Sequence, residues 1–361
     1  MTLYIGMTVL VLVMAFYCRR TVGVGFDRQR ALNVWMLMGI FVVLGGVAFC
    51  RIANSNDYWV YVEMFSLISQ KRLVSSEFGF NLFVRIMQLV CGEGKFEYIP
   101  IFGAISFVTI FFSLKAIYEQ SDWFMGSLFL FMMNGLYFSS FNSIRYYLVL
   151  AFAAFSFRYV MQKQYGRFLI CILFAATFHK SVLVVIPVYL VCRWLAENRL
   201  KWYHYVCGAI LLLSLVFGRD IYRRIIFTFY EFYEGSEFDV VRYSYTNIAK
   251  CLGTFVLCVI CRGQLGKENL RDRFLAWLNV VGLVTYTFGA FIPEVSRIAY
   301  YFTIGQIFLI PNLLFSMEKG WKRNALIAVT TIAFVLHFAL FLRNAYSTDI
   351  RLLPYMNWIF N

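Results

Sequence analysis

Residues 31–50 read ALNVWMLMGIFVVLGGVAFC, a run of twenty residues without a charged side chain, bounded by Arg30 and Arg51. At the 1.5 Å rise of an α-helix this run is about 30 Å long, which matches the hydrocarbon thickness of a bilayer. A segment in lipid must satisfy its own backbone hydrogen bonds, and a helix does so. The run therefore predicts a transmembrane helix.

Comparable apolar runs recur along the whole chain, which is 61% apolar and 14% charged and has a mean hydropathy of +0.70. A chain of this composition has too little polar surface to cover a water-soluble globule. We therefore expect an all-α polytopic integral membrane protein with about twelve transmembrane helices. The expected spans cover residues 2–18, 31–50, 97–116, 123–139, 144–161, 167–178, 182–192, 203–217, 248–262, 274–291, 299–316 and 324–342.

The length of the chain bounds what else it can contain. Spans of about 20 residues with short connections leave no room for a soluble domain in 361 residues. We expect a single transmembrane domain over residues 1–361, with outer loops near 51–96 and 218–247. The first apolar run has no basic leader before it and no small-residue cleavage site after it, which indicates a retained first helix.

The Lys and Arg residues divide unevenly between the two sets of alternate loops, eighteen against fifteen. The richer set is predicted to be cytoplasmic, with both termini outside. Cations kept on the outer side oppose this rule, so we expect an anionic partner there, either lipid head groups or a lipid-linked phosphate or pyrophosphate rather than nucleic acid. The alternative is that these side chains anchor helix ends by snorkelling.

The first polar cluster follows the run quoted above and contains Arg51, Asp57 and Glu77. It combines one cation with two carboxylates that are candidates for a general base. The apolar residues between them, 59–68, are expected to lie along the membrane interface as an amphipathic helix. The alternative is an ordinary surface loop in which Asp57 caps a helix.

Two short outer turns place an arginine at the start of the next expected helix. Arg145 follows Ser139-Ser140-Phe141-Asn142-Ser143, and Arg297 follows Pro293-Glu294-Val295-Ser296. A cation is disfavoured at the positive end of a helix dipole unless an anion binds beside it. The free N–H groups of the helix start would then contribute to the same anion site.

A third cluster, Phe178-His179-Lys180-Ser181, lies between the short runs 167–178 and 182–192, which are candidates for a broken or re-entrant pair. A lone histidine in a membrane helix is often a packing residue, but a lysine beside it requires an aqueous cavity at membrane depth. His179 is therefore a candidate for a general base or for a donor to phosphate.

The outer loop near 218–247 is rich in tyrosine and charge and includes Tyr230 and Tyr233. Aromatic faces flanked by carboxylates can stack on sugars, so we expect these two residues to bind a glycan acceptor. An aromatic belt at the membrane interface is the alternative. The other residues expected to contact glycan are Tyr58, Asn81, Asn142 and Tyr301.

The remaining sequence features do not indicate metal, disulfide or nucleotide chemistry. The nine cysteines lie within or at the ends of apolar segments, which indicates neither a disulfide framework nor a metal cluster. No phosphate-binding loop or dinucleotide fingerprint is present, which argues against nucleotide-powered work. His204 and His337 have no polar company in the sequence and are interpreted as structural.

The motifs together resemble the EpsG-like branch of the Wzy-type exopolysaccharide and O-antigen polymerases. The resemblance runs through Arg51, Asp57 and Tyr61, then Glu77-Phe78-Gly79-Phe80-Asn81, Asn142-Ser143-Ile144-Arg145, Phe178-His179-Lys180-Ser181 and Arg297-Ile298-Ala299-Tyr300-Tyr301-Phe302. The chain has Asn54-Ser55-Asn56-Asp57 where such proteins usually have Gly-Thr-Asp. It has Arg145-Tyr146 where they usually have Arg-Gln.

The resemblance implies a C-type glycosyltransferase-like membrane fold and an inverting glycosyl transfer that uses no metal and no cofactor. In that chemistry a growing glycan leaves its undecaprenyl-diphosphate carrier and joins a second lipid-linked repeat unit, at the outer face of the bacterial cytoplasmic membrane. The product is O-antigen, capsule or exopolysaccharide, and a separate protein is expected to control chain length.

The implied chemistry gives each cluster a role. A pyrophosphate leaving group requires cations, for which the candidates are Arg51, Arg145, Lys180 and Arg297. The attacking hydroxyl requires a base, for which the candidates are Asp57, Glu77 and His179.

Three alternative activities stay open. An O-antigen ligase shares the donor chemistry. A lipid-linked oligosaccharide flippase or transporter would place its charges near mid-bilayer on broken helices, whereas here they gather near one face. A membrane O-acyltransferase would need a deep catalytic histidine with polar neighbours.

Overall fold

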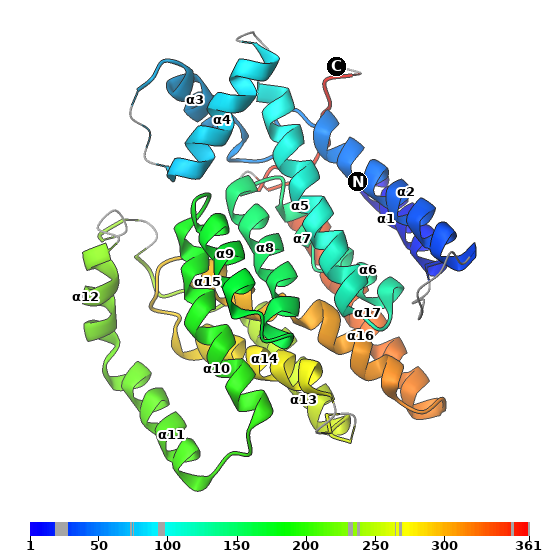
Figure 1. Ribbon diagram of the computed structural model, residues 1–361, viewed down its shortest axis with the longest axis vertical. Helices are drawn as coiled ribbons and strands as arrows, with labels where there is room; N and C mark the ends of the chain where they lie inside the picture. The colour runs from blue at the N-terminus through cyan, green and yellow to red at the C-terminus, as the bar shows by residue number, and fades with distance from the viewer. Residues whose placement is uncertain are drawn as a thin grey trace.

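The computed structural model describes residues 1–18, 28–72, 74, 76–92, 98–229, 234–236, 239–263, 265–266, 269–347 and 350–359 (Figure 1). Within these residues every regular element is a helix, and extended backbone pairs only at an isolated bridge between Arg51 and Asn357. The prediction of an all-α protein is confirmed.

The helices follow in chain order. They are α1 (Thr2–Phe16), α2 (Arg28–Cys50), α3 (Tyr58–Ser69), α4 (Phe78–Cys91), α5 (Tyr98–Gln120), α6 (Phe124–Met133), α7 (Leu136–Ser139), α8 (Ile144–Met161), α9 (Tyr165–Ala176), the 3-10 helix η1 (Lys180–Val184), α10 (Val185–Glu197), α11 (Trp202–Phe217), α12 (Arg219–Phe229), α13 (Tyr245–Ile260), α14 (Leu270–Phe288), α15 (Val295–Thr303), α16 (Gln306–Ser316) and α17 (Trp321–Asn344).

Among the described residues, five helical segments are long and apolar enough to cross a membrane, or six if the bent pair α11 and α12 counts as one span. The five are α2, α5, α8, the unit Val295–Ser316 and α17. Five further apolar helices have 10–17 residues, which is short for a 30 Å core. These helices indicate a membrane-embedded protein, while the count of about twelve spans stays a prediction.

Several expected elements differ from the structure: the run 299–316 is divided between α15 and α16, and the loop expected near 218–247 contains α12. The run 123–139 is not one helix, because Gly135 adopts a left-handed conformation, φ 71°, and separates α6 from α7. Glycine is favoured at such a turn because it has no Cβ to clash with the backbone. The region 51–96, expected as an outer loop, contains the two helices α3 and α4, of which α3 includes the predicted interfacial segment 59–68.

The centre of the bundle is α8, which packs against α5 and α9 and also touches α10 and α15. Its buried residues include Leu148, Val149, Phe152 and Phe157 and lie on every side of the helix. A helix that is apolar all round belongs in the interior of a bundle. This burial fixes the start of α8, and therefore Arg145, at one end of the core.

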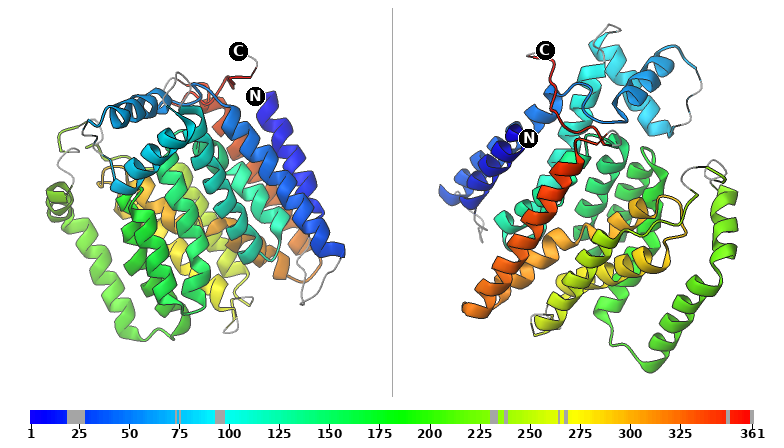
Figure 2. Two further views of the ribbon diagram at one scale, coloured as in Figure 1. Left: turned by 45° about the horizontal axis from the view of Figure 1, so that its top comes forward. Right: turned by 180° about the vertical axis from the view of Figure 1, so that it is seen from behind.

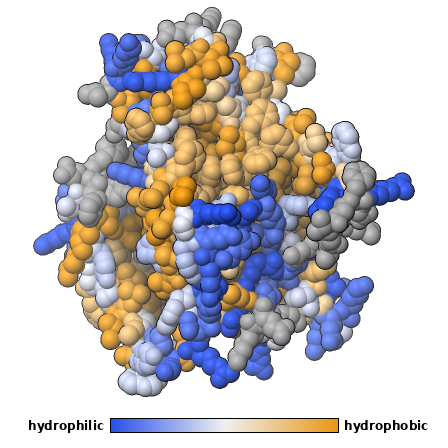
Figure 3. All heavy atoms as spheres, viewed as in Figure 1, coloured by the Kyte–Doolittle hydropathy of each residue, from blue (hydrophilic) through white to orange (hydrophobic). Residues whose placement is uncertain are grey.

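The surface is apolar over wide areas. Figure 3 shows a largely apolar upper half on the face seen in Figure 1, with hydrophilic side chains gathered at the lower centre. Trp35, Leu89 and Phe217 are among the large side chains that stay exposed. Exposed apolar surface of this extent is expected where lipid is the solvent.

Helices α11 and α12 stand at one flank of the bundle and meet at a bend of 76° (Figures 1 and 2). None of the residues of α11 is buried. Helix α12 carries Ile221, Ile225 and Ile226 together with arginines, which is the pattern of a helix at a membrane interface.

The segment after α17 folds back over the end of α2. Backbone hydrogen bonds run from Trp358 N–H to the Cys50 carbonyl at 3.1 Å and from Ile52 N–H to the Met356 carbonyl at 3.1 Å. The side-chain amide of Asn54 adds two bonds to the backbone of Met356, each 2.9 Å. This segment covers Arg51.

Candidate active site

Glu77 lies immediately before α4 and is held where α4 meets the end of α9. The N–H groups of Gly79 and Phe80 donate to the Thr177 carbonyl at 2.9 and 3.3 Å. A Cβ on residue 79 would lie 2.1 Å from Thr177 Oγ1, so only glycine permits this approach. In Figure 1, α3 and α4 lie above the ends of α8 and α9.

Glu77 binds groups from two other elements. Its Oε2 accepts a charge-assisted hydrogen bond of 2.7 Å from Arg145 Nη1 at the start of α8. Its Oε1 accepts from the backbone N–H of Lys180 at 3.2 Å and lies 3.9 Å from His179 Nδ1. The anion that the sequence predicted beside Arg145 is thus in part supplied by the chain itself.

His179 precedes η1 as its N-cap residue, and its Nδ1 accepts from the Ser181 backbone N–H at 3.4 Å. The Ser181 hydroxyl lies 3.1 Å from His179 Nδ1 and 2.8 Å from the hydroxyl of Tyr301 on α15. His179 and Glu77 side chains keep 20% and 19% of their surface exposed, so solvent reaches both. The contact with Tyr301 ties the histidine to the helix that carries Arg297.

Arg297 lies in the first turn of α15. Its Nε is 3.0 Å from Glu294 Oε2, and its backbone carbonyl accepts a 2.7 Å hydrogen bond from Tyr146 on α8. Glu294 has a left-handed backbone, φ 51°, which is costly for a residue with a Cβ and is often found at functional sites. Tyr146, which replaces the usual glutamine, therefore joins the two helices whose starts carry Arg145 and Arg297.

Asp57 precedes α3 and faces the turn before α8. Its backbone N–H donates to Asn142 Oδ1 at 3.1 Å, and its Oδ2 accepts from the Ser143 hydroxyl at 3.2 Å. Burial raises the pKa of the Asp57 carboxyl, while Ser143, Arg297 and Arg145 act in the opposite direction. The carboxyl thus lies within electrostatic range of both arginines.

A cavity of about 350 Å³ opens beside these groups. Its polar lining residues are His179, Lys180, Ser181, Glu294 and Arg297, and Ile226 of α12 contributes an apolar wall. Cavities of this size bind small ligands or parts of larger ones. Two cations, a histidine and a carboxylate therefore share one accessible space.

The environment keeps His179 neutral. Burial lowers the pKa of His179 below its usual range, and the charges of Arg145, Arg297 and Lys180 lower it further, against the opposing effect of Glu77. A neutral imidazole can accept a proton at neutral pH. The site thus offers a base next to fixed positive charge.

Three expected site residues lie elsewhere. Arg51 is 1% exposed, and its guanidinium lies over the rings of Phe141 and Phe102, at 4.5 and 5.5 Å from their centroids. Tyr58 is fully buried and stacks on Phe102. Asn81 bonds to the side chain and backbone of Ser76. None of the three lines the cavity.

Tyr230 and Tyr233 lie outside the described residues. Among the described residues no group of three or more His, Cys, Asp or Glu side chains is placed to share a metal ion.

Three residues of the site had no assigned role from the sequence: Ser143, Ser181 and Glu294. The signal for Glu294 was its spacing of three residues from Arg297, which brings the two together at a helix start. Ser143 and Ser181 each stand next to an expected site residue, but their partners are remote in the chain, and no local pattern reveals them.

The comparisons with known proteins agree with the motifs. The family model described as EpsG family matches residues 34–357, which is most of the chain and includes every residue of the cluster. A search of curated proteins and a search of solved structures found no match to this chain.

Proposed function

This chain belongs to the EpsG family, and on that premise we propose that it is a polysaccharide polymerase that joins undecaprenyl-diphosphate-linked repeat units. The proposed reaction is an inverting glycosyl transfer at the outer face of the bacterial cytoplasmic membrane, in a helical C-type glycosyltransferase-like fold. The family itself supports a membrane protein of exopolysaccharide biosynthesis.

The observation that carries the proposal is the convergence of Glu77, Arg145, His179, Lys180 and Arg297. These residues come from α4, α8, η1 and α15 and meet at one end of the bundle around one cavity. The cluster borders an open cavity, and the pKa of His179 is lowered there, a combination that is typical of functional sites.

The cations would bind the leaving group. When the bond between the donor sugar and its carrier breaks, negative charge develops on the pyrophosphate. Arg297 and Lys180 line the cavity directly. Arg145 does not line it and is hydrogen-bonded to Glu77. Charge-assisted hydrogen bonds from these groups would stabilise the departing anion without a metal.

His179 is the base that this geometry favours. It lines the cavity and is neutral, whereas Glu77 is paired with Arg145 and Asp57 is bonded to Ser143. The unprotonated ring nitrogen of the neutral imidazole would take the proton from the acceptor hydroxyl. The acceptor oxygen would then bond to the anomeric carbon as the carbon–pyrophosphate bond breaks on the opposite side. Glu77 would act as a positioning residue for His179 and Arg145.

The direct test is an incubation of the purified protein with a synthetic undecaprenyl-diphosphate-linked repeat unit, without nucleotide and with a chelator. We expect a ladder of glycans that grows by one repeat unit per step. Transfer of glycan to a different lipid would indicate a ligase. Movement of the intact substrate across proteoliposome membranes, without extension, would indicate a flippase. Either result would overturn the polymerase proposal.

The side of the membrane is tested separately. We propose that the cavity faces the periplasm or exterior, since the site residues gather at the end of the bundle that the charge distribution assigns to the outer side. A cysteine at Glu294, in a chain without other reactive cysteines, is expected to react with a membrane-impermeant reagent added outside intact cells. A cysteine at Lys322 should be protected, and the reverse pattern would contradict the orientation.

A further inference from the structure

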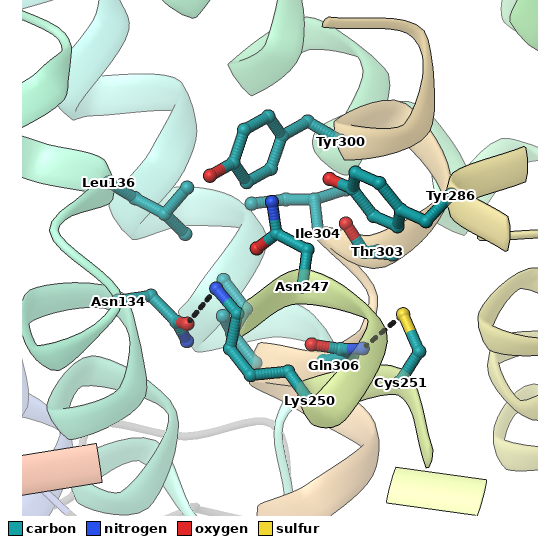
Figure 4. Close-up of a pocket in the computed structure, with 11 residues that line it drawn as sticks. Asn134, Leu136, Asn247, Lys250, Cys251, Tyr286, Tyr300, Thr303, Ile304 and Gln306 are labelled. Carbon is teal, nitrogen blue, oxygen red and sulfur yellow. Dashed lines mark hydrogen bonds between the residues drawn. The ribbon is translucent and has the colours of Figure 1, made fainter. Parts of the chain in front are cut away.

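Lys250 is an unusual residue for its position. It lies in the second turn of α13, and its Nζ donates to Asn134 Oδ1 at 3.2 Å (Figure 4). No carboxylate of the described residues forms an ion pair with it. A lysine within an apolar helix is costly in a membrane, and such residues commonly mark a binding site or a pathway.

Figure 4 shows the side chain of Lys250 at the edge of a small polar cavity. Amide and hydroxyl groups of Asn134, Asn247, Gln306 and Thr303 line this cavity, whose volume of about 10 Å³ is near that of one water molecule. The amide of Asn134, which accepts from Lys250 Nζ, is neutral and does not neutralise the ammonium group. The positive charge of Lys250 stays uncompensated within the described chain.

Lys250 also lines a much larger space. A groove of about 560 Å³ lies between α13 and α17, and Ile310 of α16 contributes to its floor. Both helices pack against α16, which separates them. Helices α13 and α17 are visible in the right-hand view of Figure 2, which shows the molecule from behind.

The groove is polar at one end and apolar along the rest. Lys250 and His337 lie near one end of the groove, within electrostatic range of each other. His337 therefore has a charged neighbour that the sequence did not indicate. The remaining walls are mostly aliphatic or aromatic, and they include Leu257, Ile260, Leu326 and Phe334. From Thr246 to Ile260 the wall formed by α13 is about 21 Å long.

This polarity matches an amphiphile with a negative head and a long apolar tail. We propose that the groove binds an anionic phospholipid, with its phosphate paired to Lys250 Nζ and one acyl chain lying along α13 and α17. The lipid supplies the anion that the chain does not, and its chain covers the apolar wall. The groove shares no lining residue with the cavity at His179, so the proposal stands apart from the proposed function.

Two variants test the two halves of the proposal. Lys250→Gln removes the charge and keeps a hydrogen-bonding side chain of similar length. Gly253→Leu fills the groove, since Gly253 lines it and a Cβ there meets no atom within 4 Å. The matched controls are Lys322→Gln and Gly208→Leu, which change exposed residues of α17 and α11 outside the groove; a Cβ at Gly208 likewise meets no atom within 4 Å.

The measurement is native mass spectrometry of the full chain in detergent, titrated with phosphatidylglycerol and, separately, with diacylglycerol and inorganic phosphate. We expect wild type and both controls to retain one phosphatidylglycerol more tightly than diacylglycerol, and inorganic phosphate not to displace it. Each test variant should weaken phosphatidylglycerol binding about tenfold or more, as expected for a lost charge-assisted contact.

Three results would overturn the proposal. Unchanged binding in Gly253→Leu would show that the lipid lies elsewhere. Unchanged binding in Lys250→Gln, or equal binding of diacylglycerol by wild type, would show that charge is not recognised. Displacement by inorganic phosphate would show a phosphate site without a role for the groove. Thermal unfolding of each variant is measured alongside, and the two variants act through different chemistry, so misfolding of one leaves the other informative.

Discussion

Two ionic clusters of the described residues lie at opposite ends of the bundle, and they are built differently. The outer cluster comprises Asp57, Glu77, Arg145, His179, Lys180, Glu294 and Arg297. The inner cluster comprises Asp122, Asn269, Arg271, Asp272 and Asn312, which join the turn before α6 to α14 and α16. Both contain arginine and carboxylate side chains in close contact.

The inner cluster is fully paired, although Arg271 and Asp122 keep 23% and 24% of their side-chain surface exposed. Arg271 binds Asp122 through two nitrogens and also contacts Asp272 at 3.2 Å. Asp272 is fully buried and accepts a 3.0 Å hydrogen bond from Asn312. Every charge has a fixed partner, which is the arrangement that ties helices together.

The outer cluster keeps reactive groups accessible. Asp57 has a hydroxyl rather than a cation as its hydrogen-bond partner, His179 is neutral, and Arg297 is 39% exposed beside a cavity. The comparison teaches that the number of charges does not separate a structural cluster from a functional one. Incomplete pairing beside an open cavity does so.

The largest effect is expected from His179→Gln. Removing the general base should lower the rate of repeat-unit coupling about 10²- to 10⁴-fold while the protein stays folded. The rate is measured by single-turnover assays with lipid-linked substrate, and thermal unfolding reports stability. A rate within about threefold of wild type would assign the base to Asp57 or Glu77 instead.

A change in the inner cluster should have the opposite signature. Asp272→Ala removes one of the two carboxylates that contact Arg271 and leaves Asn312 Nδ2 without its acceptor, which is expected to destabilise the fold by about 1–3 kcal/mol. The coupling rate per folded molecule should not change. Unfolding measurements with activity normalised to the folded fraction check this, and a folded but inactive variant would show that the inner cluster takes part in function.

The arginines of the outer cluster should be sensitive to a change that keeps their charge. Arg297→Lys and Arg145→Lys lose the planar fork that binds phosphate through two nitrogens, and a loss of about tenfold in coupling rate is expected for each. Arg223→Lys, on α12, is the control. Full activity in both site variants, at normal membrane levels, would contradict bidentate binding of pyrophosphate.

The smallest effect concerns pH. The pKa of His179 is lowered, so the neutral base persists to more acidic pH than an ordinary histidine, and kcat/KM should fall only as the pH drops through that lowered pKa. Glu77 opposes the shift, so Glu77→Gln should move the acidic limb of the profile to still lower pH. An unchanged limb would mean that the charge of Glu77 does not act on His179.

Much of the fold could be predicted from apolar runs alone. The span predicted over 144–161 coincides with α8, and most other runs coincide with helices to within a few residues, because a segment in lipid has few alternatives to a helix. The break at Gly135 was not predicted, since one glycine in an apolar run does not reveal its backbone conformation.

The candidate site could be predicted only in part. The motifs identified Glu77, Arg145, His179 and Arg297, but the pairing of Glu77 with Arg145 depends on how α4 meets α9 and could not be inferred from spacing. Arg51 was expected at the same site. The structure buries it among aromatic rings under the segment after α17, a contact between chain positions about 300 residues apart that no local pattern reports.

The central claim is that the outer cluster performs chemistry and the inner one holds the fold. The most direct test compares initial coupling rates, per folded molecule, of wild type, His179→Gln and Asp272→Asn in one preparation of lipid-linked repeat units. The account predicts at least a hundredfold loss for His179→Gln and none for Asp272→Asn. Equal losses in the two variants, or a loss confined to Asp272→Asn, would contradict it.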